Sequence, residues 1–157
     1  MPEERPVVRR EEKWRASHVK MARNQISFDL EQKGKKPIHV HDRVIKKRNT
    51  WVGNWRRDRP TVYVDPRLTK KEQTAVALHE GVERYEAVHR RLPKYPAHLV
   101  AEHIEERWDR GHGLGKGYQQ HVEQIFRSNV ESHGTRIGIT GDIDRMVGRM
   151  LRKGRKR

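Results

Sequence analysis

The chain of 157 residues contains no cysteine, so neither a disulfide framework nor a thiolate metal site can form. It also lacks any apolar run that approaches about 18 residues, and we therefore expect no transmembrane helix. Residues 1–12 are polar and carry charges of both signs, unlike a secretory signal. Together these absences favour a cytoplasmic protein that has no membrane partner.

Apolar and acidic side chains are also in short supply. Only 32% of residues are hydrophobic against 36% charged, which limits the core, and the length fits one domain. The net charge is +15, to which residues 1–68 contribute +9, residues 69–110 nothing and residues 111–157 +6. Such a basic surface attracts nucleic acid and other polyanions. The alternative is a surface that serves solubility alone.

The first half of the chain indicates a helix followed by strands. Residues 10–32 have a thin apolar stripe at helical spacing, and we predict a basic N-terminal helix there. Residues 38–41 alternate like a strand, and the β-branched and aromatic segment 61–65 lies between two prolines. With residues 48–57 as a further strand or an ordered turn, the pattern predicts a small antiparallel sheet of two or three strands.

Helices are predicted to dominate the second half. Thr69 and Glu72 have the spacing of a capping box, so a helix should begin near residue 70 and extend to residue 91. Pro93 and Pro96 then interrupt the helical pattern. Further helices are predicted over residues 97–110, 118–132 and 140–151, with a Gly-rich loop at 111–117 and a basic tail at 152–157.

We therefore predict an α+β fold. A small antiparallel sheet packs against a helical hairpin that carries the site, and additional C-terminal helices follow. The expected divisions are an N-terminal basic helix or arm (1–36), a core of sheet and two-helix site (37–110), and a C-terminal part of loop, helices and tail (111–157).

One spacing of histidine and glutamate occurs twice in the neutral segment. A histidine is followed by glutamates at i+4 and i+7 in His79, Glu83, Glu86 and again in His98, Glu102, Glu105. On an α-helix each triple lies on one face. Because only a short break separates the two segments, a helical hairpin would bring two histidines and several carboxylates together. That arrangement is the outline of a metal site.

The first triple lies in the sequence His79-Glu80-Gly81-Val82-Glu83. This segment resembles the active helix of the zincin metallopeptidases, whose motif is H-E-x-x-H, with Glu83 in place of the second histidine. The strand-then-helix order is similar to that of small ImmA/IrrE-like and SprT-like zincins, and the resemblance covers roughly residues 61–108. It implies a Zn²⁺ site with His79 and Glu83 as ligands and Glu80 as general base. The alternative is an amphipathic helix with a solvated acidic face.

Zincins take a third metal ligand from a later helix or loop. His98 is our first choice, because it repeats the position of His79. Glu102 lies on the same helical face and could be a ligand or a hydrogen-bond partner of His98. The alternative places Glu102 and its neighbours in surface ion pairs with nearby arginines, which contribute little to stability.

Three other patterns carry weaker signals. Glu86 and His89 have the Glu-x-x-His spacing of di-iron bundles, but the second helix has no matching pair. His39 and His41 share one face of a strand, where a solvated face or a phosphate contact is the competing interpretation. The loop 111–117 lacks the spacing of a P-loop and fits a flexible connector.

Aromatic and cationic residues interleave in residues 51–59, a pattern that can stack bases and hold phosphates or form an ordinary packed hairpin. The candidate nucleic-acid contacts are Trp55, Arg56, Arg57, Arg59, Arg152, Lys153, Arg155, Lys156 and Arg157. We expect a zinc-binding, zincin-like metalloprotein, in its catalytic form a peptidase with a protein substrate, whose basic surface attracts nucleic acid. The competing interpretation is a non-catalytic nucleic-acid-binding or virion-associated structural protein of phage type on the same scaffold.

Overall fold

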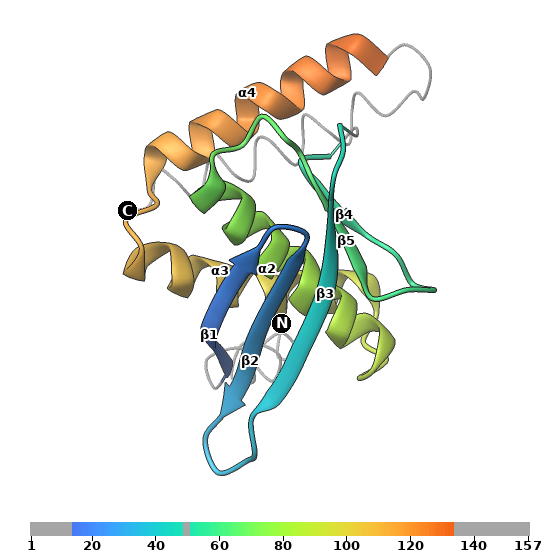
Figure 1. The fold of residues 1–157 in the computed structure, drawn as a ribbon, viewed down its shortest axis with the longest axis vertical. Coiled ribbons are helices and arrows are strands. Elements are labelled where there is room, and N and C mark those ends of the chain that lie inside the picture. The colour runs from blue at the N-terminus through green and yellow to red at the C-terminus, as the bar shows by residue number, and fades with distance from the viewer. Residues whose placement is uncertain (1–13, 49–50, 134–157) are drawn as a thin grey trace, which may run out of the picture.

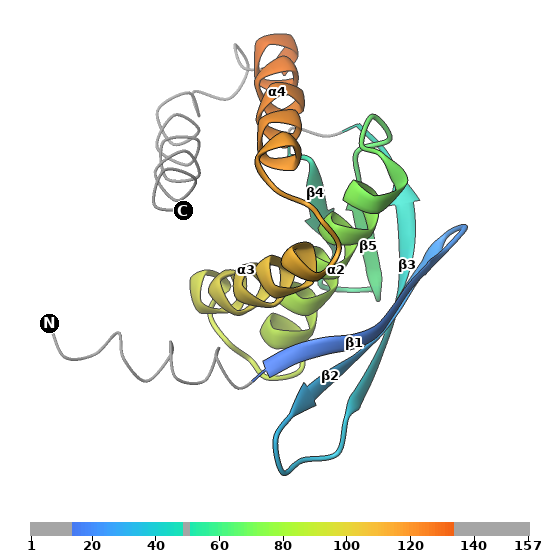
Figure 2. The same cartoon turned by 90° about the vertical axis from the view of Figure 1, so that its left-hand side faces the viewer.

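A computed structural model describes residues 14–48 and 51–133, and the structural statements that follow concern these residues. Helices cover one face of a five-stranded sheet (Figures 1 and 2), so the fold is α+β as predicted. The elements are β1 (Trp14–Ala22), β2 (Gln25–Gln32), β3 (Ile38–Lys46), β4 (Gly53–Trp55), β5 (Thr61–Val64), α2 (Lys70–Val88), α3 (Lys94–Gly111) and α4 (Lys116–His133). The helix predicted over 140–151 lies outside the described residues.

The sheet is larger than the sequence predicted, with strand order β1-β2-β3-β5-β4. All neighbouring strands are antiparallel except β3 and β5, which pair in parallel with Arg43 opposite Thr61. Strand β4 is only three residues long and pairs with β5 at the edge of the sheet. After β3 the chain therefore crosses to the edge of the sheet and forms β4 there. It then returns as β5, which lies between β3 and β4.

The predicted N-terminal helix is wrong, because residues 14–32 form the β1–β2 hairpin. In β2, Ile26, Phe28 and Leu30 are buried at every second position, as expected for one face of a strand. Alternation in β1 is disturbed by a shift of register between Ser17 and Lys20, where His18 has a φ of 51°. Since β2 also pairs with β3, this segment belongs to the same sheet as the rest of the core.

Helix α2 packs closely against the sheet and carries most of the site. The predicted capping box at Thr69 is confirmed, with reciprocal hydrogen bonds between Thr69 and Glu72. At Gly81 a Cβ atom would lie 3.0 Å from the ring of Phe28, so a glycine allows this close approach. One turn further on, the buried Arg84 donates from Nε to Oδ2 of Asp42 on β3 at 2.9 Å.

A tight turn folds α3 back along α2, as the predicted helical hairpin requires. Helix α2 ends at Val88, before the predicted end at residue 91, and the chain takes a left-handed conformation at Arg91, with a φ of 54°. The amide of Leu92 then donates to the carbonyl of Glu86 at 3.0 Å, which closes the end of the helix. Helix α3 begins three residues earlier than predicted and buries Ala97, Val100, Ala101 and Ile104.

Helix α4 crosses the upper end of the molecule in Figure 1 and is anchored by polar side chains. Arg67 forms a two-pronged ion pair with the buried Asp65, at 2.9 and 2.7 Å, and also donates to Asn129 on α4. His121 of α4 lies 2.7 Å from Oε1 of Glu72. These contacts place α4 over the N-terminal half of α2. No helix in the described part of the chain is long and apolar enough to cross a membrane.

Candidate metal centre

The structure brings together the three side chains that we favoured as ligands. His79 and Glu83 lie one turn apart on α2 and face His98 near the start of α3. Nε2 of His79 is 3.2 Å from Oε2 of Glu83 and 3.1 Å from Nδ1 of His98. Nδ1 of His98 is 3.0 Å from the same Glu83 oxygen. Within the described residues, this is the one group of three or more His, Asp or Glu side chains whose ligand atoms all lie within 4.8 Å of one another.

These three atoms are placed so that they could hold a metal ion, and zinc gives a test of the distances. Zinc bonds to nitrogen and oxygen of about 2.0–2.2 Å place neighbouring ligand atoms of a tetrahedron about 3.3–3.6 Å apart. The observed separations of 3.0–3.2 Å are slightly shorter, so a small outward rotation of the side chains would accommodate an ion. Two histidines and one glutamate also form a donor set of catalytic zinc sites, which keep one coordination position open.

A second layer of hydrogen bonds orients two of the ligands. Nδ1 of His79 lies 2.7 Å from Oε2 of Glu105, and the hydroxyl of Tyr118 donates to Oε1 of Glu105 at 2.6 Å. The indole N–H of Trp55 donates to the second carboxylate oxygen of Glu83 at 3.2 Å. A carboxylate behind a ligating histidine fixes its tautomer and ring orientation. When His79 is neutral and its Nδ1–H is turned to Glu105, the Nε2 lone pair faces the other two candidate ligands.

The ionisation of the ligands reflects this packing. Burial alone would lower the pKa of His79, but hydrogen bonds with Glu105 and Glu83 raise that pKa well above its usual value. Burial alone would raise the pKa of Glu83, yet hydrogen bonds from His79 and His98 hold it below its usual range. The surroundings therefore favour an ionised Glu83 and a proton on Nε2 of His79, and a metal ion at this place would have to displace that proton before it could bind the Nε2 lone pair.

Glu80 lies beside the ligands, beneath the edge strand β4. A Cβ atom at Gly53 would lie only 2.7 Å from Oε1 of Glu80, so strand and carboxylate are in close contact. Burial raises the pKa of Glu80 to about 8; the positive charge of His79 opposes this shift and the negative charges of Glu83 and Glu105 add to it. With its pKa at about 8, Glu80 is largely protonated at neutral pH, and a cation bound beside it would favour the carboxylate that a general base needs.

The other candidate ligands lie outside the cluster. Glu102 lies one turn beyond His98 and lines the adjoining cleft, but it is not part of the group of converging ligand atoms. The carboxylate behind a ligand is instead Glu105, and it contacts His79. The di-iron alternative has no support from the geometry, because buried Glu86 pairs with Arg90 and His89 is exposed. His39 is exposed and pairs with Asp29.

A cleft of about 210 Å³ opens beside the three ligands. Helices α2, α3 and α4 and the segment leading into β4 all contribute to its lining. The lining consists of Trp51, Val52, Gly53, Val76, His79, Glu80, His98, Glu102, Glu105, Glu106, Asp109, Tyr118, Gln119, Val122, Glu123 and Phe126. The participation of Tyr118 was not predicted, because no spacing in the sequence connects it to the repeated motif.

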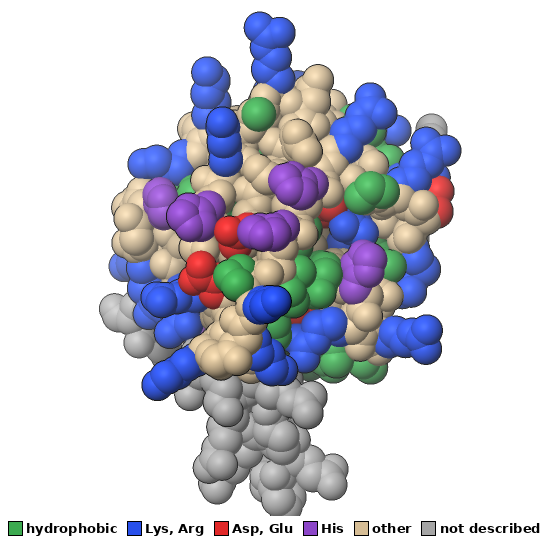
Figure 3. All heavy atoms as spheres, turned by 60° about the horizontal axis from the view of Figure 1, so that its bottom comes forward, with side chains coloured by type: hydrophobic (Ala, Val, Ile, Leu, Met, Phe, Trp, Pro, Cys, Tyr) green, Lys and Arg blue, Asp and Glu red, His purple; other side chains and the backbone are tan. Residues whose placement is uncertain are grey.

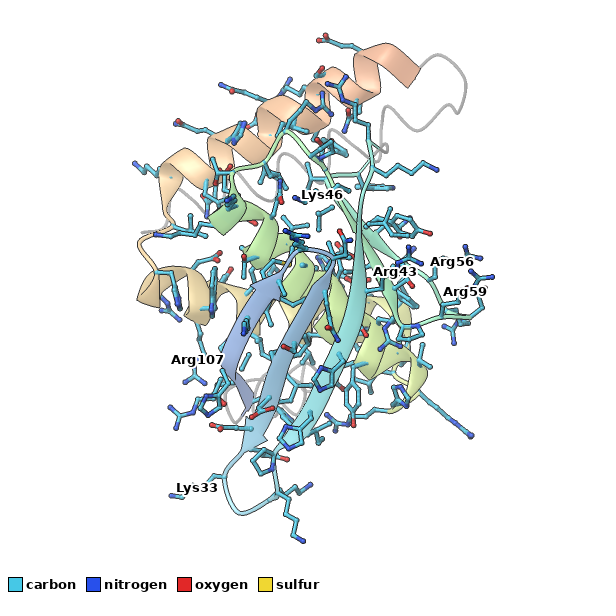
Figure 4. The ribbon with its side chains drawn as sticks, in the orientation of Figure 1. Lys33, Arg43, Lys46, Arg56, Arg59 and Arg107 are labelled. Atoms are coloured by element: carbon cyan, nitrogen blue, oxygen red, sulfur yellow. The ribbon has the colours of Figure 1, made fainter. Side chains whose placement is uncertain are left out.

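The predicted nucleic-acid contacts lie in two different surroundings. Trp55 is partly buried and donates a hydrogen bond to the candidate ligand Glu83, with the guanidinium of Arg57 5.9 Å from its ring centre. Arg56 and Arg59 are exposed around the β4–β5 turn and both pair with Asp58. Figure 4 shows Arg43 of β3 beside them. The tail residues Arg152, Lys153, Arg155, Lys156 and Arg157 lie outside the described residues.

Lysine and arginine side chains project from the face of the molecule that Figure 3 shows. Figure 3 brings forward the lower end of Figure 1, and Lys and Arg side chains project around this whole face with few Asp or Glu side chains between them.

A comparison with models of known protein families, with curated proteins and with solved structures finds no match for this chain. The chemistry of the site therefore has to be argued from its own geometry.

Proposed function

We propose that this protein is a zinc-binding, zincin-like metallopeptidase. The observation that carries the proposal is the triangle of Nε2 of His79, Oε2 of Glu83 and Nδ1 of His98, with edges of 3.0–3.2 Å. The triangle lies at one end of a cleft large enough for part of a peptide. Glu80, with its raised pKa, lines the same cleft next to His79.

Each residue has a distinct role in the proposed reaction. His79, Glu83 and His98 hold the ion, while Glu105 and Trp55 keep two of these ligands in position. When bound, zinc would lower the pKa of a coordinated water and polarise the peptide carbonyl. Glu80 then accepts the proton of the attacking water and delivers it to the leaving amine. Glu83 replaces a neutral histidine with an anionic ligand, which reduces the positive charge available to the substrate carbonyl.

The proposal is tested by metal analysis together with peptide cleavage. Protein purified without chelators or a nickel column should contain about one equivalent of zinc. Glu80→Gln should keep the zinc and lose cleavage, because Glu80 is base and not ligand. His79→Ala should lose both, whereas His41→Ala, which removes an exposed histidine on the sheet, should lose neither. Absence of zinc from the wild-type protein, or loss of zinc in Glu80→Gln, would contradict the assignment.

The second candidate function is non-catalytic binding of nucleic acid. The observation in its favour is the group of exposed arginines Arg43, Arg56 and Arg59, where β3 passes the β4–β5 turn (Figure 4). The amides of Arg43 and Arg56 bond to the carbonyls of Pro60 and Thr61, so one short segment brings their backbones together. A compact positive group of this kind suits a phosphate backbone. This function needs no metal and would leave the cleft as a remnant of the scaffold.

A further inference from the structure

One face of the sheet has no helix on it in the part of the chain that the structure describes. Figure 2 shows the helices on the other side of the sheet. In β3 the residues that point toward these helices, Val40, Asp42 and Val44, are buried. His41 and Arg43, at the alternate positions, are exposed. We call this exposed side of the sheet the open face.

The register of the strands places an aromatic ring between two arginines on the open face. The valines of β5 belong to the core, so Tyr63 between them points to the open face. Arg43 on β3 lies opposite Thr61, two residues before Tyr63. From the β4 side, the amide of Arg56 donates to the carbonyl of the same Thr61 at 3.1 Å. The two arginines therefore flank the strand that carries Tyr63.

Tyr63 is in contact with one of these arginines. Hydrogen bonds with Asp58 and with Tyr63 raise the pKa of the exposed Arg56 guanidinium above its usual value. The tyrosine side chain is partly exposed, and Ile45 on β3 and Asn54 on β4 lie directly opposite it. A ring and a cation are therefore held side by side on the same face.

Positive charge exceeds negative charge around this ring after the ion pairs are counted. Asp58 pairs with both Arg56 and Arg59, so these three exposed side chains together keep one positive charge. Lys20 of β1 and Arg43 are exposed and form no ion pair with any residue of 14–48 or 51–133. Because exposed ion pairs are weak, a phosphate can also compete with Asp58 for the two guanidinium groups.

The carboxylates of the open face lie at its other end and are paired. Asp29 pairs with His39, and Glu31 pairs with Arg15 at 3.7 Å. Both carboxylates belong to the end of β2 that leads into the β2–β3 loop. The half of the face that carries Tyr63 is therefore the half that suits an anion.

A base and a phosphate are the two groups that fit this half together. Every base has a π-face that can stack on the ring of Tyr63, and guanidinium groups bind phosphate oxygens. In a duplex the bases are stacked on one another, so a broad sheet face reaches mainly the backbone. A single strand presents its bases and its phosphates at the same time.

We propose that the open face binds single-stranded nucleic acid, with a base stacked on Tyr63 and neighbouring phosphates held by Arg43 and Arg56. The proposal rests on the second candidate function, because it names the ligand and the contact surface of that function. It depends on neither zinc nor cleavage, because the ligand triangle lies on the side of the sheet that the helices cover. The phosphates and unstacked bases that it uses are common to RNA and DNA.

Anisotropy titrations of the full chain with matched oligonucleotides test the preference. The probes are a fluorescein-labelled DNA strand of about 12 nucleotides, the RNA of the same sequence, and the corresponding DNA duplex. At about 50 mM sodium chloride we expect both single strands to bind at least about fivefold more tightly than the duplex. Charge alone would favour the duplex, which has more closely spaced phosphates, so this preference reports contacts with bases.

Substitutions at Tyr63 separate stacking from charge. Tyr63→Leu should weaken single-strand binding about 5- to 100-fold, because it removes the stacking ring. The slope of log K against log salt should stay unchanged in this variant, since the ring contacts no phosphate. Tyr63→Phe keeps the ring and should retain affinity within about twofold. Circular dichroism and urea denaturation check that both variants fold.

Two further variants complete the set. Arg43→Ala should lower the salt slope for a single strand by about 0.7, as expected when one phosphate contact is lost. Tyr95→Leu makes the same chemical change as Tyr63→Leu at an exposed tyrosine on α3, and it should alter neither the affinity nor the slope.

The outcomes distinguish the proposal from the function on which it rests. Binding of the duplex as tightly as the single strands, or an equal loss in Tyr63→Leu and Tyr95→Leu, contradicts the proposal but leaves nucleic-acid binding by the arginines intact. Polyglutamate that competes as well as an unlabelled single strand shows a general preference for polyanions and also contradicts it. Absence of binding to every oligonucleotide removes both the proposal and the second candidate function.

Discussion

Nδ1 of His79 lies 2.7 Å from Oε2 of Glu105, and this contact ties the first proposed ligand on α2 to the middle of α3. Tyr118 of α4 donates to the other oxygen of Glu105, so three helices meet behind one imidazole. Burial and the adjacent negative charge of Glu105 raise the pKa of Tyr118 well above its usual value, which keeps this hydroxyl a donor. The orientation of His79 therefore depends on the packing of all three helices.

Replacing Glu105 by glutamine should lower zinc affinity by about 10- to 100-fold, the usual cost of losing the partner of a ligating histidine. Competition with a chelator of known affinity measures the change. Glu102→Gln is the matched control on the same helix, and it should cause a smaller loss, because Glu102 is outside the ligand cluster. A larger loss in Glu102→Gln would identify Glu102 as a ligand and contradict the geometry.

A methyl group at Gly53 should disturb the site from the side of the sheet. Its Cβ would lie 2.5 Å from Cγ1 of Val76 and 2.7 Å from Oε1 of Glu80, so β4 or Glu80 has to move. We expect Gly53→Ala to reduce the free energy of unfolding by about 1–3 kcal/mol and to impair cleavage more than zinc binding. Gly117→Ala has open space around the new methyl group and should be neutral or slightly stabilising in urea denaturation.

The buried ion pair of Asp65 and Arg67 should make stability depend on pH in the acidic range. Burial alone would raise the pKa of Asp65, but hydrogen bonds from Arg67 and Asn129 hold it below its usual value. A depressed pKa stabilises the fold above the unfolded-state pKa of about 3.9, and this contribution disappears as pH falls through the folded-state value.

Asp65→Asn should therefore destabilise the protein by about 3 kcal/mol near pH 7. The difference between the variant and the wild type should shrink below about pH 4, where the wild type also loses its carboxylate. Urea denaturation at a series of pH values measures this. The salt-bridged but exposed Asp58 gives the control, since Asp58→Asn should change stability little at any pH. A constant difference across the whole range would show that the effect of Asp65→Asn is not electrostatic.

Changing Arg43, Arg56 and Arg59 together to alanine should weaken binding of DNA or RNA without altering zinc content. The three arginines are exposed and separate from the ligand cluster, so the two properties should vary independently. Binding of the wild-type protein should fall steeply with salt, and each phosphate contact removed should lower the slope of log K against log salt by about 0.7–0.9.

A triple change of Lys33, Lys35 and Lys36 to alanine, in the β2–β3 loop, serves as the charge-matched control for the arginine cluster. An equal loss of affinity in both triple variants would point to overall charge in place of a defined surface. Loss of zinc in the arginine variant would show that the two regions are coupled.

The hairpin that carries the site could be predicted because its determinants are local. The Thr69 capping box sets the start of α2, and a spacing of four residues puts His79 and Glu83 on one helical face. The proline-containing break then favours a reversal of the chain direction between the two helices. This reversal brings His98 close to His79 and Glu83. Each of these steps depends on residues within about one or two helical turns.

The parts that could not be predicted depend on contacts between distant segments. A bulge at His18 hides the alternation of β1, so the hairpin of residues 14–32 resembled a helix. Neither the sequence of β3 nor that of β5 indicates by itself that the two strands pair in parallel. Whether Glu102 or Glu105 meets a ligand depends on how α3 crosses α2, and the hydrogen bond from Trp55 to Glu83 requires β4 at the sheet edge.

The short edge strand β4 gives the cleft a wall with low local stability. Only three residues pair with β5, and the other side of β4 has no strand partner among the described residues. Local opening of such a segment costs much less free energy than global unfolding. Amide hydrogens of Gly53–Trp55 should therefore exchange with solvent earlier than those of β2 or α2. Each local opening of β4 would break the hydrogen bond from the indole N–H of Trp55 to Glu83. The opening rate of this edge strand would therefore set how often the Glu83 carboxylate loses its indole donor.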